Sequence, residues 1–133
     1  MRTIAGIQLL LVVLLLSTGG CTTVQDARDA KGFGIPRVYG ASFDTVWDAI
    51  PKATSRWGLD VLDENEQERY ILAVKGVTLF SFGENVAVFV DKVDDKETRV
   101  EVVSMPVVII NLFARNWGEP ILEELSRMLS ANK

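Results

Sequence analysis

The feature that most constrains the fold of this chain is a pair of segments in which valines alternate with other side chains. Residues 86–93 carry valine at every second position in their first half, and residues 98–105 repeat this spacing after the turn Asp-Asp-Lys-Glu at residues 94–97. Successive side chains of a strand point to opposite faces, and a short polar turn suits an antiparallel connection. The pattern therefore predicts a β-hairpin with one buried face.

Three further segments have the character of strands. Residues 70–74 form an apolar run of strand length, and residues 59–61 alternate apolar and polar side chains before a charged turn. Val38 and Tyr39 are expected to form a short first strand.

A first helix is predicted over residues 43–57, where apolar side chains recur at helical spacing. Ser42 is the expected N-cap, and Gly58 suits the left-handed position that follows the last turn. Pro51 lies in the interior of this helix and should bend or weaken its middle turn.

A second helix is predicted near the C-terminus. Asn116 and Glu119 have the spacing of a capping box, and an apolar stripe runs from Trp117 to Leu129. The fold class that follows is α+β: an antiparallel sheet of about four strands with both helices packed on one face, in the order β-α-β-β-β-β-α.

Composition excludes several kinds of chemistry. The chain has no histidine and a single cysteine, so it cannot use Cys–His nucleophiles or zinc ligation by these residues, nor form a disulfide within the chain. Its net charge of −4, without a basic cluster, argues against a nucleic-acid partner.

The N-terminal segment has the three parts of an export signal: Arg2 near the start, an apolar run over residues 4–16, and small residues at 17–20. Cys21 follows at once, and this arrangement resembles the lipobox of bacterial lipoproteins, although the family mostly has leucine where this chain has Thr18. An ordinary secretory signal and an uncleaved membrane anchor are the alternative interpretations.

The lipoprotein resemblance implies that residues 1–20 are removed as a signal peptide. Cys21 would then become the first residue, carry diacylglycerol on its sulfur and be acylated on its amine. In double-membrane bacteria an aspartate after the cysteine tends to retain the protein at the inner membrane, and here Thr22 stands in that place. The resemblance therefore implies a lipid anchor in the outer membrane, with the protein on the periplasmic face.

Residues 21–36 are polar and interrupted by glycine, which predicts a flexible tether before a single domain over residues 37–133. The order of elements in that domain, with the sequences SFDTVWDAI, FSFGENVAVFV, TRVEVVS and NWGEPILEEL, resembles small bacterial lipoprotein domains. It is more distantly similar to the helix-grip domains of the C component of the β-barrel assembly machinery. This resemblance implies a fold and a periplasmic scaffold role, and no binding residues.

Two apolar runs, residues 77–82 and 106–113, exceed what a half-exposed strand requires. They can be a strand or a loop that covers the core. They can also stay exposed as a contact patch, with Phe80 and Phe82 at its centre, for an envelope protein or for the bilayer surface. The chain's three tryptophans lie on helix stripes, which favours core packing, while a cavity between helices and sheet would make them a lining for an apolar ligand.

Carboxylates cluster at two expected turns, residues 60–68 and 94–97, next to lysines and arginines, as solvated loops do. Calcium at Asp94 and Asp95 is conceivable, but the ligand spacing of a dedicated loop is missing. We therefore expect no cofactor and no enzymatic activity, but a membrane-anchored lipoprotein with an interaction or envelope-maintenance role. The alternative is a domain that binds a small ligand or lipid between helices and sheet.

Overall fold

A computed structural model of the protein describes residues 20–108 and 113–131. Within these residues, five strands form one antiparallel sheet in the spatial order β1-β5-β4-β3-β2. The strands are β1 (Ile35–Tyr39), β2 (Asp60–Asn65), β3 (Tyr70–Lys75), β4 (Glu84–Lys92) and β5 (Thr98–Pro106). The expected signal peptide lies outside the described residues, except for Gly20.

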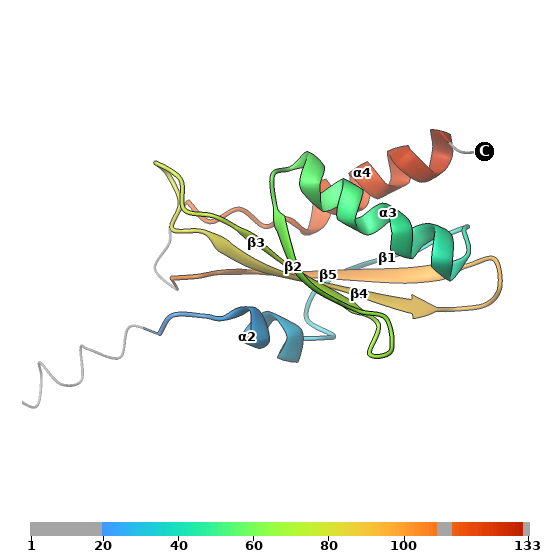
Figure 1. Cartoon of the computed structure of the whole chain (residues 1–133), viewed down its shortest axis with the longest axis horizontal. Coiled ribbons are helices and arrows are strands. Elements are labelled where there is room, and N and C mark those ends of the chain that lie inside the picture. Colours follow the sequence, from blue (N-terminus) through green and yellow to red (C-terminus); the bar gives the residue numbers. More distant parts are fainter. Residues whose placement is uncertain (1–19, 109–112, 132–133) are drawn as a thin grey trace, which may run out of the picture.

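Helices α3 (Phe43–Arg56) and α4 (Gly118–Ala131) cover one face of the sheet, and the short helix α2 (Val24–Asp29) lies against the other face (Figure 1). The α+β class and the antiparallel sheet are therefore confirmed. From β1 to α4 the elements follow the predicted order β-α-β-β-β-β-α, which gives five strands against the stated count of about four. Helix α2 is an addition, on the face for which no helix was predicted.

The hairpin of β4 and β5 is confirmed, with Val88 opposite Val102 and Val90 opposite Val100. These valines face α3 and α4 and belong to the main core cluster. The prediction of one buried face was wrong, because a second cluster fills the other face beneath α2. It contains Ala27, Tyr70, Leu72, Ala87, Phe89 and Val103.

Helix α3 follows its sequence signals. The Ser42 side chain accepts a hydrogen bond from the Thr45 amide, which satisfies one free donor of the first turn. Gly58 has a φ of 68°, a left-handed conformation that glycine adopts without steric cost. Pro51 lies inside the helix, as predicted.

Helix α4 begins differently from its prediction. Its first residue is Gly118, whose amide donates to Asn116 Oδ1 at 2.9 Å. Glu119 does not complete a capping box, because its carboxylate pairs with Arg37 of β1 at 2.8 Å. A Cβ on Gly118 would lie 2.7 Å from Ile35 Cδ1, so a larger residue there would require the Ile35 side chain to shift.

Helix α2 and the start of β1 lie within residues 21–36, for which the sequence predicts a flexible tether. A complete capping box joins Thr23 and Asp26, and the bonds from the Thr23 amide and hydroxyl lower the pKa of the Asp26 carboxyl. Ala27 is fully buried against the sheet. Six residues are too few to display a helical period, which is why the sequence pattern did not reveal this packed element.

Candidate functional site

The loop between β3 and β4 exposes large apolar side chains. The exposed fraction is 97% for Leu79, 77% for Phe80 and 61% for Phe82, and Val77 is also exposed. The sequence left open whether this run covers the core or stays on the surface, and the structure places it on the surface. Phe113, in the second apolar run, is exposed as well, whereas residues 109–112 of that run lie outside the described residues.

We use the name apolar end for this set of side chains: Val77, Leu79, Phe80, Phe82 and Phe113. Part of it lines a shallow hollow of about 240 Å³, which is formed by Thr78, Leu79, Phe80, Ser81, Phe82 and Phe113. The hollow brings Phe113, from the second run that the sequence marked as unusually apolar, to the first run, although 31 positions separate Phe113 from Phe82.

Hydrogen bonds within the β3–β4 loop hold its shape. The Thr78 amide donates to the Ser81 carbonyl at 2.8 Å, and the Ser81 amide donates back to the Thr78 hydroxyl at 3.0 Å. Gly83 closes the loop with a φ of 97°, and a Cβ there would lie 2.7 Å from the Lys75 carbonyl oxygen. The exposed side chains are therefore presented by an internally bonded loop.

A buried carboxylate joins this loop to the segment before α4. Glu84, only 1% exposed, accepts hydrogen bonds from the Ser81 hydroxyl at 2.6 Å and from the Arg115 amide at 3.1 Å. The Trp117 indole donates to its second oxygen at 3.4 Å. Sequence reasoning missed Glu84, because its partners lie up to 33 positions away.

Two cations border the apolar end. The Arg115 guanidinium lies between the rings of Trp57 and Trp117, 5.1 Å and 4.8 Å from their centroids. The Lys75 ammonium lies 5.5 Å from the Trp117 centroid and donates to the Trp57 carbonyl at 2.8 Å. Aromatic faces attract cations, so both charges are held at these tryptophans. Lys75 precedes Val77 by two positions and Arg115 follows Phe113 by two, which places both cations next to the apolar end along the chain.

Cys21 is exposed and lies at this same end of the sheet. It forms an isolated antiparallel bridge with Val108, just beyond β5. The residue before Val108, Val107, donates its amide to the Gly83 carbonyl at 3.0 Å and so connects the segment after β5 to the β3–β4 loop. Figure 1 shows the loop, the end of β5 and the start of the described chain at one end of the molecule.

The side chains of the main core cluster lie between the helices and the sheet. Trp47 and Trp117 are buried in the main core cluster, as predicted, and Trp57 is packed at its edge, 6.2 Å from Trp117 between ring centroids. This packing gives no support to the alternative in which the tryptophans line an interior ligand cavity.

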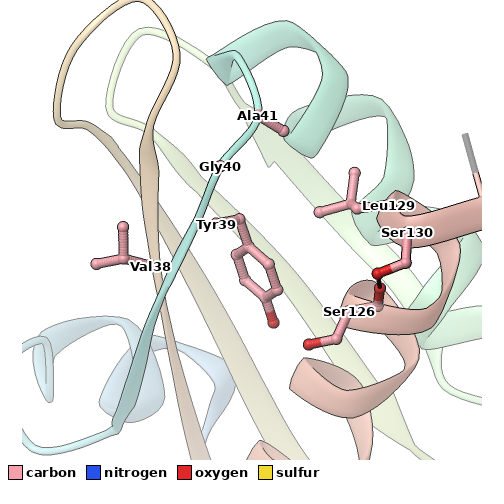
Figure 2. A pocket seen from close by; sticks show the side chains of 7 residues that line it. All are labelled: Val38, Tyr39, Gly40, Ala41, Ser126, Leu129 and Ser130. Atoms are coloured by element: carbon pink, nitrogen blue, oxygen red, sulfur yellow. Dashed lines mark hydrogen bonds between the residues drawn. The ribbon is translucent and has the colours of Figure 1, made fainter. Parts of the chain in front are cut away.

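A second hollow, of about 200 Å³, lies between the end of β1 and α4 (Figure 2). Tyr39 lines it, and the Tyr39 hydroxyl donates to the Leu122 carbonyl at 2.6 Å. Burial raises the pKa of this phenol above its ordinary value. The hydrogen bond of the Tyr39 hydroxyl thus joins β1 to α4.

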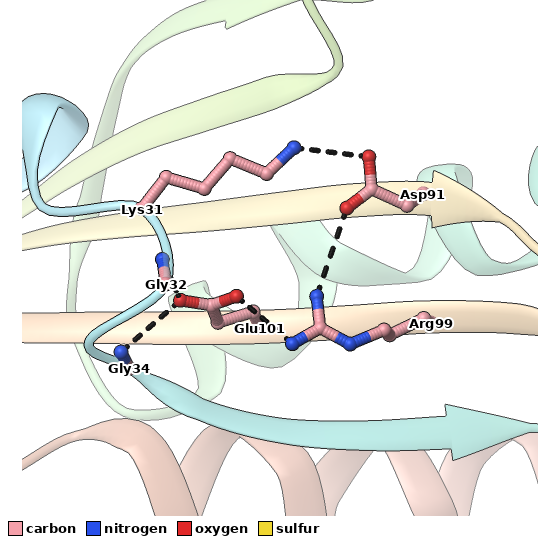
Figure 3. Close-up of polar contacts among 6 residues, drawn as sticks. All are labelled: Lys31, Gly32, Gly34, Asp91, Arg99 and Glu101. Carbon is pink, nitrogen blue, oxygen red and sulfur yellow. Dashed lines mark hydrogen bonds and ion pairs between the residues drawn. The ribbon is translucent and has the colours of Figure 1, made fainter.

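A buried glutamate accepts two backbone amides on the opposite face of the sheet (Figure 3). Glu101 accepts from Gly32 at 2.5 Å and from Gly34 at 3.1 Å, and Arg99 pairs with its other oxygen. Burial alone would raise the pKa of Glu101. The two amides and the Arg99 guanidinium outweigh burial, so the pKa lies below its ordinary value. The bonds from the Gly32 and Gly34 amides to Glu101 attach the segment before β1 to β5.

Of the two predicted acidic turns, residues 94–97 form a turn, whereas the prediction was wrong for residues 60–65, which form β2, so that the other turn begins only at Glu66. Asp94 Oδ1 accepts the amides of Lys96 and Glu97 at 2.7 Å each, and Asp95 pairs with Lys92. Hydrogen bonding to Lys92 also lowers the pKa of Asp95. Within residues 20–108 and 113–131, no three His, Cys, Asp or Glu side chains gather as a metal site would require.

In the same residues, no helix has the length and apolar character needed to cross a bilayer. Comparison with known proteins adds no family: neither a protein-family model nor a curated protein matches this chain.

Proposed function

We propose that this chain is a non-enzymatic lipoprotein of the bacterial envelope, anchored through lipid on Cys21 and acting by interaction with another envelope component. In a double-membrane host the anchor belongs to the outer membrane and the domain to its periplasmic face. The sequence resemblance to a lipobox suggests the modification, and Cys21 is the residue that would carry it.

The single observation that best supports the proposal is the position of Cys21. Its side chain is exposed at the edge of the sheet, where no core packing competes with a bulky substituent. The apolar end lies at the same end of the sheet and offers an interaction surface with Phe80 and Phe82 at its centre. Exposed apolar side chains gathered in this way are typical of contact surfaces.

The helix-grip resemblance belongs to the same proposal. It is supported by the antiparallel sheet with α3 and α4 on one face. The chemistry of the described residues also favours binding over catalysis, because the buried carboxylates Glu84 and Glu101 are both occupied by internal hydrogen bonds.

Membrane fractionation tests the proposal. The full chain is expressed in a double-membrane bacterium beside Cys21→Ala, and inner and outer membranes are separated on a density gradient. We expect the wild type in the outer membrane and the variant absent from it. Thr22→Asp serves as a matched control, since it keeps the lipidation site and should move the protein to the inner membrane. A wild-type protein that is soluble in the periplasm contradicts the proposal.

A further inference from the structure

We propose that the apolar end is a membrane-docking surface: Leu79, Phe80 and Phe82 enter the surface of the phospholipid bilayer that holds the anchor. The inference deepens the proposed function and takes from it the lipid on Cys21. It assigns the occupant of the contact patch and fixes the orientation of the domain, with the β3–β4 end toward lipid.

The first argument is the position of the anchor relative to the patch. The Thr22 amide donates to the Val107 carbonyl at 2.8 Å, and the Thr22 carbonyl accepts from Asn85 Nδ2 at 3.0 Å. The chain is therefore fixed to the sheet one residue after Cys21. No free tether separates the lipid from the domain, so the anchor brings this end of the sheet to the bilayer.

The place of the leader in the sequence, directly before the described chain, gives the same orientation without lipidation. The apolar run of residues 4–16 precedes Gly20, where the described chain begins, at the end that carries the β3–β4 loop. Whether the membrane is reached by acyl chains or by the uncleaved leader, the apolar end is the part of the domain placed beside it.

The second argument is the chemistry of the loop. Residues 76–83 contain no charged side chain, and their apolar members are exposed at a loop whose backbone bonds are largely internal. Lys75 and Arg115 border the apolar end as cations. The carboxylate at the base of the loop, Glu84, is only 1% exposed and is bonded to Ser81. Apolar side chains that penetrate the headgroup layer, flanked by lysine or arginine, are the usual composition of a membrane-surface segment.

The third argument is the distribution of charge along the sheet. In an antiparallel sheet the β2–β3 and β4–β5 turns lie at the end opposite the β3–β4 loop. These turns carry exposed carboxylates, namely Glu66, Glu68, Asp94, Asp95 and Glu97, and the cations Arg69 and Lys96. Two of the carboxylates are paired, Glu68 with Arg28 and Asp95 with Lys92. In the proposed orientation the carboxylates of these turns lie away from the membrane, so anionic lipids do not repel them.

Depth measurement with a fluorescent label tests the inference. Leu79→Cys is expressed as the full chain, purified from membranes, labelled with NBD and reconstituted into vesicles of phosphatidylethanolamine and phosphatidylglycerol that contain an acyl-chain quencher. Because the sulfur of a lipidated Cys21 is a thioether, the new cysteine is the only free thiol. Intact mass of the same sample reports whether Cys21 carries lipid.

Two variants serve as controls. Phe33→Cys places the label at an equally apolar and exposed position that precedes β1, away from the apolar end. Lys96→Cys places it in the turn at the opposite end of the sheet. We expect the quencher to reduce the fluorescence at residue 79 at least threefold more than at residues 33 and 96.

Each outcome decides between the two proposals. Lipidated protein with a label at residue 79 that stays in water overturns the docking inference and leaves the anchor intact; capture of a protein partner by the patch would then be the remaining role. If the intact mass shows no lipid on Cys21, the three labelled variants are prepared again with Cys21→Ser and added to the same vesicles, and the quenching at residues 79, 33 and 96 is compared. Selective quenching at residue 79 then supports docking and overturns the lipid anchor, and its absence overturns both.

Discussion

The amide of Thr22 donates to the carbonyl of Val107 at 2.8 Å, so the residue after the only cysteine is paired with the residue that follows β5. Val107 in turn donates to Gly83, which closes the loop that carries Phe80 and Phe82. The expected lipidation site and the exposed apolar side chains are thereby connected through two backbone hydrogen bonds.

Replacing Phe80 and Phe82 together with serine should leave the stability of the protein unchanged. Both side chains are mostly exposed, and surface substitutions typically change the free energy of unfolding by no more than about 0.5 kcal/mol. In a Cys21→Ser background, where acyl chains contribute nothing, the double variant should lose insertion into a phospholipid monolayer. Urea unfolding and the rise in surface pressure measure the two effects.

Phe33→Ser is the matched control for this pair, because Phe33 is 90% exposed and lies outside the apolar end. It should insert into the monolayer like its parent. A double variant that unfolds at much lower urea would show that Phe80 and Phe82 support the core instead.

Glu84→Ala should destabilise the protein by about 2–4 kcal/mol, because hydrogen bonds to a charged group contribute about 1.5–3 kcal/mol each and the buried donors lose their acceptor. The Trp117 indole and the Arg115 amide would both be left without this carboxylate. Glu84→Gln keeps an acceptor oxygen and should lose less. Equal stability of Glu84→Ala and wild type, measured by urea unfolding, would refute the role of this carboxylate in joining the β3–β4 loop to α4.

Glu101 should make stability depend on pH in the acidic range. Its pKa is lower in the folded protein than the ordinary 4.5, so its contribution is present above that value and is lost as pH falls through the folded pKa. Glu101→Gln resembles the protonated form. The difference in unfolding free energy between wild type and this variant should therefore be largest near pH 7 and shrink below pH 4.5. A difference that is the same at both pH values would contradict the claim that the ionised Glu101 carboxylate stabilises the folded protein.

Asn85→Ala should loosen the segment that carries the anchor. The Asn85 side chain donates to the Thr22 carbonyl at 3.0 Å, and a hydrogen bond of about 1 kcal/mol corresponds to roughly a five- to tenfold change in local opening. Hydrogen exchange of the Thr22 amide should accelerate by that factor, while central amides of β3 keep their rates. Unchanged exchange at Thr22 would show that other contacts fix this segment.

The sequence predicted the elements whose signals are local. The valine alternation of β4 and β5 is visible within each strand, and the caps of α3 at Ser42 and Gly58 lie next to the helix they limit. Each of these signals depends only on residues that are neighbours along the chain, and the structure confirms each prediction.

The features that the sequence did not reveal depend on distant partners. Glu119 has capping-box spacing, but Arg37, 82 positions away, takes its carboxylate. Glu101 looks like an outward-facing strand residue until α2 and the glycines before β1 cover that face. The exposure of Phe80 was equally undetermined, because an apolar run has the same composition whether it covers a core or extends from it.

The central claim is the lipid on Cys21, and the intact mass of the membrane-purified protein tests it most directly. The account predicts a protein that begins at residue 21 and is heavier than its amino-acid sequence by a diacylglyceryl group and one further acyl chain. It also predicts that Cys21→Ala lacks this added mass. A wild-type protein with a free thiol at Cys21 would contradict the claim.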